Sequence, residues 1–188
     1  MTEALILIGS PRKHGNSTVL AEAAARAARD AGASVELVRL HDLKISPCAG
    51  CGDCRSSVDA PCILEDDMTE LYPRLRSADA LLIATPIYSY DMTAQTKLFV
   101  DRLYALGSHE GNALQGKRFG FLLVYGGSDP FSSGAATAMR CFHDTFARKA
   151  SWMRMIHGTT ANVGSVAENP RLMAAAARLG ADLVTDSV

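Results

Sequence analysis

The feature that most constrains the fold of this chain is a short apolar run, residues 4–8, that is followed by Gly9-Ser10-Pro11. The run is continuous and holds no polar residue, which is typical of a strand buried on both faces of a parallel sheet. From residue 19 the apolar residues recur with helical spacing, and Gly32 is placed to end that helix. The chain therefore opens with a strand, a turn and a helix.

The same alternation continues along the chain. Strands are predicted at residues 34–40, 80–84, 118–125 and 152–156, and helices at residues 19–31, 65–77, 92–106, 132–150 and from Pro170, with a turn at Thr85-Pro86. Five strands separated by helices predict an α/β, doubly wound parallel sheet with right-handed crossovers. In such sheets, ligands bind at the carboxyl edge of the strands, where the strand order reverses. We interpret residues 1–188 as one domain with a Cys-rich loop at about residues 41–64.

Charge and hydropathy argue against two kinds of partner. The formal net charge of −1 gives no electrostatic reason to expect nucleic acid or an acidic membrane surface. No stretch approaches the ~18 apolar residues of a spanning helix. Residues 1–3 also lack the basic region that opens a signal peptide. We therefore expect a soluble, cytoplasmic protein that binds neither nucleic acid nor membrane, and whose cysteines serve metal or redox chemistry.

The turn after the first strand, residues 9–18, has the composition of an anion site. Free amides at a helix N-terminus, together with the helix dipole, attract a phosphate. The turn adds hydroxyls, an amide and a guanidinium, which bind phosphate oxygens: Ser10, Arg12, Asn16, Ser17 and Thr18. It is neither a Walker A loop nor GxGxxG, which disfavours a nucleoside triphosphate or a dinucleotide. The alternative at this stage is that Asn16 and Ser17 merely cap the helix.

These motifs resemble the NAD(P)H-dependent FMN reductase family of flavodoxin-like proteins. The similarity rests on Gly-Ser-Pro-Arg and Gly-Asn-Ser-Thr within residues 9–18, on residues 85–92, and on the segment 97–102. It implies a sheet of order 2-1-3-4-5 and an FMN phosphate held by residues 9–18. It also implies that the isoalloxazine ring is lined by Pro86, Ile87, Tyr88, Ser89 and Met92 and closed by Tyr125, Gly126 and Gly127. Without the resemblance, Pro86 and Tyr88 are also compatible with an ordinary turn that carries an aromatic lid.

Four of the five cysteines form a compact array, C-x₂-C-x₂-C-x₇-C, made of Cys48, Cys51, Cys54 and Cys62. Thiolates so close in sequence can converge on one metal centre, and four of them suit a [4Fe–4S] cluster. The spacing resembles that of iron–sulfur flavoproteins, a subgroup of the same family. Unligated thiols, a zinc site, and a disulfide such as Cys48–Cys54 or Cys51–Cys54 remain open alternatives. Cys141, within a helical pattern, is expected in the core.

Three functions follow from these interpretations. The first is an oxidoreductase that takes electrons from NAD(P)H through FMN to a small acceptor, such as a quinone, flavin, metal ion or dye. The flavin supplies that chemistry, so no catalytic side chain is predicted. The second is an electron carrier that receives electrons from a ferredoxin-like protein through the cluster, and the third is a non-catalytic sensor of a phosphate ligand. The resemblance also implies a homodimer or homotetramer that completes the site across the interface.

Overall fold

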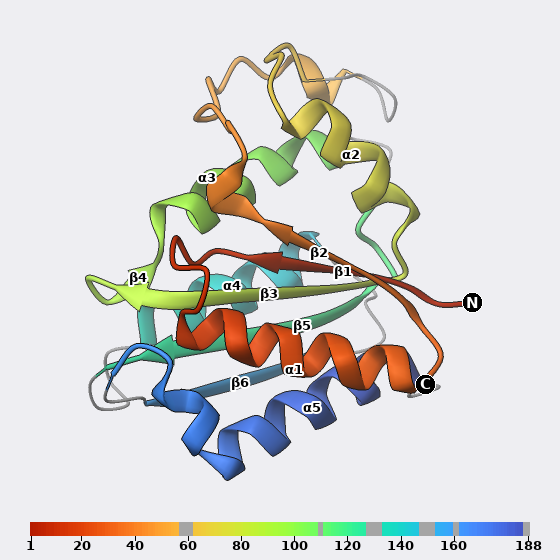
Figure 1. Cartoon of the computed structure of the whole chain (residues 1–188). Helices are drawn as coiled ribbons and strands as arrows, with labels where there is room; N and C mark the ends of the chain where they lie inside the picture. The colour runs from red at the N-terminus through yellow and green to blue at the C-terminus, as the bar shows by residue number, and fades with distance from the viewer. Residues whose placement is uncertain (57–61, 109–110, 127–132, 147–152, 160–161, 186–188) are drawn as a thin grey trace.

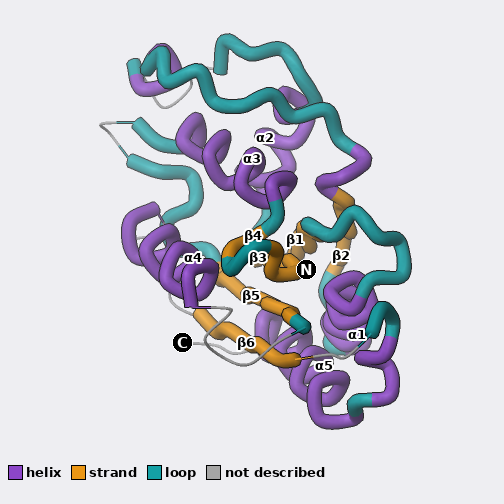
Figure 2. Tube along the Cα trace, turned by 90° about the vertical axis from the view of Figure 1, so that its left-hand side faces the viewer, coloured by secondary structure: helices purple, strands orange, loops and turns teal. Residues whose placement is uncertain are grey.

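The computed structural model describes residues 1–56, 62–108, 111–126, 133–146, 153–159 and 162–185. A twisted sheet runs through the middle of the molecule, with helices on both faces (Figure 1, Figure 2). Helices α1 (Asn16–Asp30) and α5 (Pro170–Thr185) cover one face. The other face is covered by α2 (Met68–Ser77), α3 (Ala94–Arg102) and α4 (Ser133–Phe146). No helix in these ranges is long and apolar enough to span a membrane.

The sheet has the predicted class. Its five long strands are parallel and are arranged in the order β2-β1-β3-β5-β6: β1 (Glu3–Ile8), β2 (Ser34–Arg39), β3 (Ala80–Tyr88), β5 (Arg118–Tyr125) and β6 (Met153–Thr159). A two-residue antiparallel strand that was not expected, β4 (Asp91–Met92), pairs with β3 and makes the sheet six-stranded. The α/β, flavodoxin-like arrangement is therefore confirmed, and the strand order differs from the expected 2-1-3-4-5 only because β4 takes a number. The order reverses between β1 and β3.

The apolar strands are buried on both faces because helices cover both. In β1, Leu5 and Leu7 belong to the core that includes residues of α2, α3 and α4, whereas Ile6 and Ile8 belong to the core under α1 and α5. All four side chains are essentially inaccessible to solvent. Helix α1 ends as predicted at Gly32, which has a φ of +91°. The carbonyl oxygen of the Asn169 side chain accepts the N–H of Leu172 (3.1 Å), which caps α5.

Several elements differ from the prediction. Pro86 was expected in a turn, but β3 continues through it to Tyr88, and Pro86 itself pairs with Val124 of β5. Strand β1 accompanies β3 only as far as Ala84, and β4 pairs only with Ile87 and Tyr88. Pro86 therefore pairs with β5 alone, and a residue without N–H is tolerated at this position. The helix expected at residues 92–106 is split into β4, α3 and a 3₁₀ turn, η3 (Leu103–Leu106). Cys141 lies on the exposed side of α4, not in the core.

Other boundaries shift by a few residues. Helix α1 begins at Asn16 instead of residue 19, and α2 begins at Met68 instead of residue 65. Strand β6 extends to Thr159, beyond the expected end at residue 156. Trp152, the expected first residue of that strand, and residues 147–150 of the fourth predicted helix lie outside the described residues.

Candidate functional site

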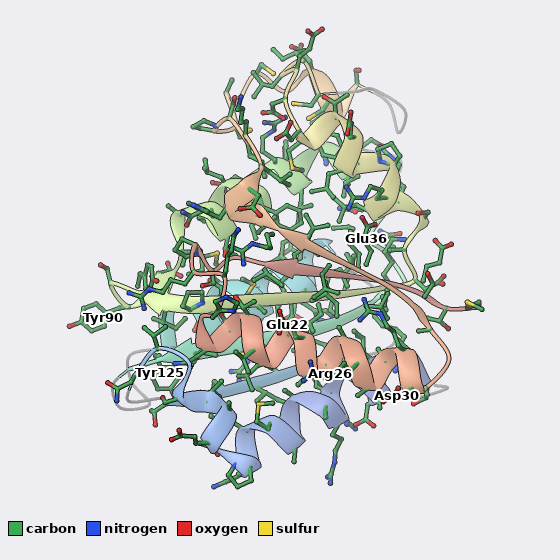
Figure 3. All side chains as sticks on the ribbon, viewed as in Figure 1. Glu22, Arg26, Asp30, Glu36, Tyr90 and Tyr125 are labelled. Carbon is green, nitrogen blue, oxygen red and sulfur yellow. The ribbon has the colours of Figure 1, made fainter. Side chains whose placement is uncertain are left out.

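A cleft of about 280 Å³ opens at the carboxyl edge of the sheet, at the reversal of strand order. It lies on the side to which Tyr90 and Tyr125 point in Figure 3. Segments far apart in the sequence meet there: the turn after β1, the ends of β3 and β5, and the turn before η5 (Ser165–Glu168). The lining residues are Ser10, Arg12, Gly15, Asn16, Ser17, Pro86, Ile87, Tyr88, Val124, Tyr125, Gly126, Asn162 and Val163. Most of the residues predicted to bind FMN are thus brought together.

The turn that enters the cleft is folded by its own polar groups. The Ser10 hydroxyl accepts the N–H of Arg12 (3.2 Å), and the Thr18 hydroxyl donates to the carbonyl of Arg12 (3.1 Å). Gly15 is the N-cap of α1, and no side chain of the described residues caps this helix. The alternative that Asn16 and Ser17 serve as its caps is therefore wrong. An uncapped helix start that faces a cleft leaves backbone amides for an anion.

Ser17 is a second indication that the start of α1 is suited to bind an anion. Its hydroxyl is buried in the cleft wall and has no hydrogen-bond partner among the described residues. A buried polar group without a partner costs about 1–3 kcal/mol, so such groups are rare unless a ligand or water satisfies them. The orphaned hydroxyl and the uncapped helix start fit a phosphate group.

Replacement of Ser17 by alanine is expected to have opposite effects on stability and on FMN binding. Loss of the orphaned hydroxyl stabilises the FMN-free protein by about 1 kcal/mol, whereas loss of a hydrogen bond to a charged phosphate weakens FMN binding about tenfold. Urea unfolding of the FMN-free protein and fluorescence titration with FMN measure the two effects. Ser77→Ala, at an exposed position outside the cleft, is the control. It removes a hydroxyl that donates to the carbonyl of Arg74 (3.2 Å), so it should leave FMN affinity unchanged and should not stabilise the protein. Unchanged FMN affinity in Ser17→Ala would contradict the phosphate assignment.

The side chain of Asn16 lines the cleft and also makes hydrogen bonds to a distant part of the chain. Its side-chain N–H donates to the carbonyl of Asn162 (2.7 Å), and its side-chain oxygen accepts the N–H of Val166 (3.2 Å). These bonds hold the turn at residues 162–166 against the start of α1. Asn162 and Val163 line the cleft but were missed from the sequence, because the turn signal of Gly164 (φ +82°) predicts a bend and not a ligand. Asn16 therefore positions one wall of the cleft.

Three of the residues predicted to bind FMN, all of them described, are not part of this lining. Thr18 is buried behind the turn, and Met92 packs in the core under α3 and α4. Ser89 is exposed and, like Tyr90, has a positive φ (49° and 71°), because both form the tight turn between β3 and β4. Gly127 lies outside the described residues.

Two aromatic side chains border the cleft from different strands. Tyr125 is buried, and its ring stacks on His157 of β6 with a centroid distance of 6.3 Å. The Tyr125 hydroxyl and Nδ1 of His157 are 3.2 Å apart, within hydrogen-bond distance. Tyr88, in contrast, is 42% exposed at the rim. Tyr125 is thus a fixed wall, whereas Tyr88 presents an accessible ring.

The four cysteines of the array surround a second pocket of about 270 Å³, which is also lined by Ile63, Leu64 and Tyr104. Gly50 and Gly52 have positive φ values (67° and 86°) and let the backbone curve around it. Burial raises the pKa of Cys54 above its ordinary value, and the three other thiols of the array add to that rise. The thiols are therefore close enough to influence one another.

The state of the thiols bears on the disulfide alternative for this pocket. All five cysteines lie in described ranges and none forms a disulfide, so the sequence-based disulfide alternative has no support. Within the described ranges, no three His, Cys, Asp or Glu side chains are grouped so that they could hold a single metal ion. The four thiols that line the pocket are the ligand set of a [4Fe–4S] cluster and also of a tetrahedral zinc ion, so both interpretations stand.

The two pockets lie at opposite ends of α3. At the first end, the N-cap Thr93 donates its hydroxyl to the carbonyl of Gly9 (2.8 Å), next to the cleft. At the other end, Tyr104 of η3 lines the cysteine pocket. A nine-residue helix is roughly 14 Å long. In Figure 1 the segment that precedes the grey trace at residues 57–61, in orange, rises to the top of the molecule, beyond α3.

Fold and cleft together define a flavodoxin-like protein with a cleft at the carboxyl edge of its sheet. More specifically, the chain belongs to the NADPH-dependent FMN reductase family, whose model matches residues 2–154. This membership confirms the resemblance seen in the motifs and the expectation of an FMN-dependent oxidoreductase.

Two curated relatives are iron-sulfur flavoproteins. The protein from Archaeoglobus fulgidus is 38% identical over 125 residues, which cover 66% of this chain and 55% of the relative. The protein from Methanosarcina thermophila is 31% identical over 166 residues, 86% of this chain and 80% of the relative. Among solved structures, an NAD(P)H:quinone oxidoreductase from Methanothermobacter marburgensis matches with a TM-score of 0.77 and 18% identity, over 100% of this chain and 99% of that one. The last similarity shows a common fold.

Proposed function

We propose that this protein is an oxidoreductase that transfers electrons from NAD(P)H through FMN to a small acceptor, such as a quinone, flavin, metal ion or dye. The observation that carries the proposal is the buried, orphaned hydroxyl of Ser17 beside the uncapped start of α1. Bound FMN would supply the redox chemistry, since its ring accepts a hydride and releases electrons singly or in pairs. The side chains of the cleft have the tasks of binding, orientation and exclusion of water.

The lining residues divide these tasks by position. Ser10, Arg12 and Ser17 are proposed to bind the phosphate, where the guanidinium adds a positive charge to the helix dipole. Pro86, Ile87 and Tyr88 are the last residues of β3 and are proposed to border the ring, as are Tyr125 and Gly126 at the end of β5. Gly126 presents no side chain, so a planar ring can approach the backbone there. The exposed ring of Tyr88 can cover the outer face of the site and exclude water.

The cysteine pocket favours a second function, that of an electron carrier. Cys48, Cys51, Cys54 and Cys62 are proposed to hold a [4Fe–4S] cluster, which would supply one-electron transfer when bound. A ferredoxin-like protein is the donor proposed for that route. Because free thiols and such clusters require reducing conditions, the cytoplasm is the proposed location.

A homodimer or homotetramer is proposed as the working form. The two pockets of one chain are separated by the length of α3. Each pocket has an exposed apolar side chain at its edge. Val163 is 57% exposed at the cleft, and Ile63 is 55% exposed at the cysteine pocket. Exposed apolar groups around a functional site are typical of surfaces that pair with another chain. These features support a second copy that completes the site.

Anaerobic purification with flavin, iron and sulfide quantified together tests the proposal. We expect about one FMN and about four iron and four sulfide atoms per chain. Rapid anaerobic bleaching of the flavin by NADPH supports the oxidoreductase, whereas bleaching only by a reduced ferredoxin supports the carrier. A colourless protein that takes up no FMN on reconstitution contradicts both and leaves the non-catalytic phosphate sensor.

A further inference from the structure

Arg102, the last residue of α3, is a buried cation behind the cysteine pocket. Its side chain is 1% exposed and that of its partner Asp66 is 6% exposed. Nη1 donates to one carboxylate oxygen of Asp66 (2.5 Å) and Nη2 to the other (3.2 Å), so the pair is bidentate. Burial alone would raise the pKa of Asp66, but the hydrogen bond from Arg102 holds this pKa below its ordinary value. Both groups are therefore charged.

This ion pair ties together the two ends of the cysteine segment. Nη1 of Arg102 also donates to the carbonyl of Ser46 (2.9 Å), and Asp66 accepts the N–H of Ser46 (2.8 Å). Ser46 lies just before Cys48, and Asp66 lies just after Cys62. The ion pair thus fixes both ends of the segment that carries the array to the end of α3.

Arg102 also contacts the array itself. Its Nη2 lies 3.5 Å from Sγ of Cys62, within hydrogen-bond distance for sulfur. Its Nε–H is buried and has no acceptor among the described residues. An arginine that served only to neutralise Asp66 would not need a donor directed to sulfur. A positive group that donates to a ligand sulfur stabilises the more negative, reduced state of the group that the sulfur binds.

We propose that Arg102 is a positioning residue that holds Cys62 in the array through Nη2–H and raises the reduction potential of the group bound by the four cysteines. The inference rests on the proposed function, in which those cysteines hold a [4Fe–4S] cluster. It adds a residue that is not a ligand and that lies outside the lining of the cysteine pocket.

Two substitutions with opposite expected effects test the inference. Arg102→Lys keeps the positive charge near Asp66 but loses the second N–H arm that reaches Cys62. We expect it to lower the reduction equilibrium constant of the cluster about tenfold, or ~59 mV for one electron. Asp66→Asn removes the negative charge next to Arg102 and should shift the potential upward. A merely structural role would shift the reduction potentials of both variants in the same direction, because both substitutions weaken the Arg102–Asp66 ion pair.

The measurement is an anaerobic redox titration followed by electron paramagnetic resonance, with iron and sulfide quantified for every variant. Lys97→Gln is the matched control, since it removes one positive charge from the same helix at an exposed ion pair with Asp101. The control should leave the potential unchanged. If Arg102→Lys folds but loses iron, the positioning role is supported. If Arg102→Lys does not fold, the direction in which Asp66→Asn shifts the reduction potential decides: an upward shift supports the proposed role of Arg102, and a downward shift contradicts it.

Two other outcomes separate the inference from the function on which it rests. Wild-type protein without iron and sulfide would overturn the proposed cluster itself. Wild-type protein that holds the cluster, together with variants whose potentials are unchanged or shift together, would overturn the role of Arg102 and leave the cluster assignment intact.

Discussion

Replacement of Cys54 by serine is expected to reduce the iron content from about four atoms per chain to less than about one. Cys54 is the buried member of the array, at 8% exposure, whereas Cys48 and Cys51 are exposed. A hydroxyl is a harder ligand than a thiolate and holds iron–sulfur clusters poorly. The loss of the innermost ligand should therefore remove the whole cluster. Iron, sulfide and visible absorbance after anaerobic purification measure the effect.

The flavin content and a second cysteine provide the controls for Cys54→Ser. Cys141 is exposed on α4 and is not among the residues that line the cysteine pocket, so Cys141→Ser should retain iron and sulfide. The FMN content should stay the same in both variants, because the cleft lies at the other end of α3. Full iron content in Cys54→Ser, or zinc in place of iron in the wild type, would contradict the cluster assignment.

The strands and the turn after β1 could be predicted because local sequence determines them. A short continuous apolar run such as residues 4–8 is typical of a strand that is covered on both faces, and the structure buries it in two cores. Pro86 shows the limit of such reasoning. Its local signal is a turn, but β3 extends past the end of β1, and this tertiary pairing is what permits proline within the strand.

Contacts between distant segments account for what the sequence did not reveal. Asn16 holds Asn162 across 146 positions, so the amide that was predicted to bind phosphate also shapes the opposite wall of the cleft. Arg102 lies in a motif that helped to identify the family, but its burial against Asp66, 36 positions away, depends on where the long cysteine segment returns to the fold. Periodicity and residue type carry no signal for either pairing.

The contact between α1 and α5 links the fold to the cleft. Gly180 of α5 faces the backbone of α1, and a Cβ at this position would lie 2.0 Å from the carbonyl oxygen of Ala24. Helix α1 begins at the wall of the cleft, next to the orphaned hydroxyl of Ser17. Displacement of α5 from α1 should therefore affect both the stability of the protein and the geometry of the cleft.

Gly180→Ala is expected to destabilise the protein by about 3 kcal/mol, because overpacking against backbone cannot be relieved by a side-chain rotation. Helix propensity alone predicts the opposite sign, a stabilisation of about 1 kcal/mol. Urea unfolding of the FMN-free protein distinguishes the two, and FMN titration should show weaker binding as α1 shifts. Ala174→Gly is the matched control: this alanine is exposed on the same helix, and its replacement should cost only about 1 kcal/mol. If Gly180→Ala proves more stable than the wild type, α1 and α5 are not packed backbone to backbone, and the position of the anion site at the start of α1 does not depend on this contact.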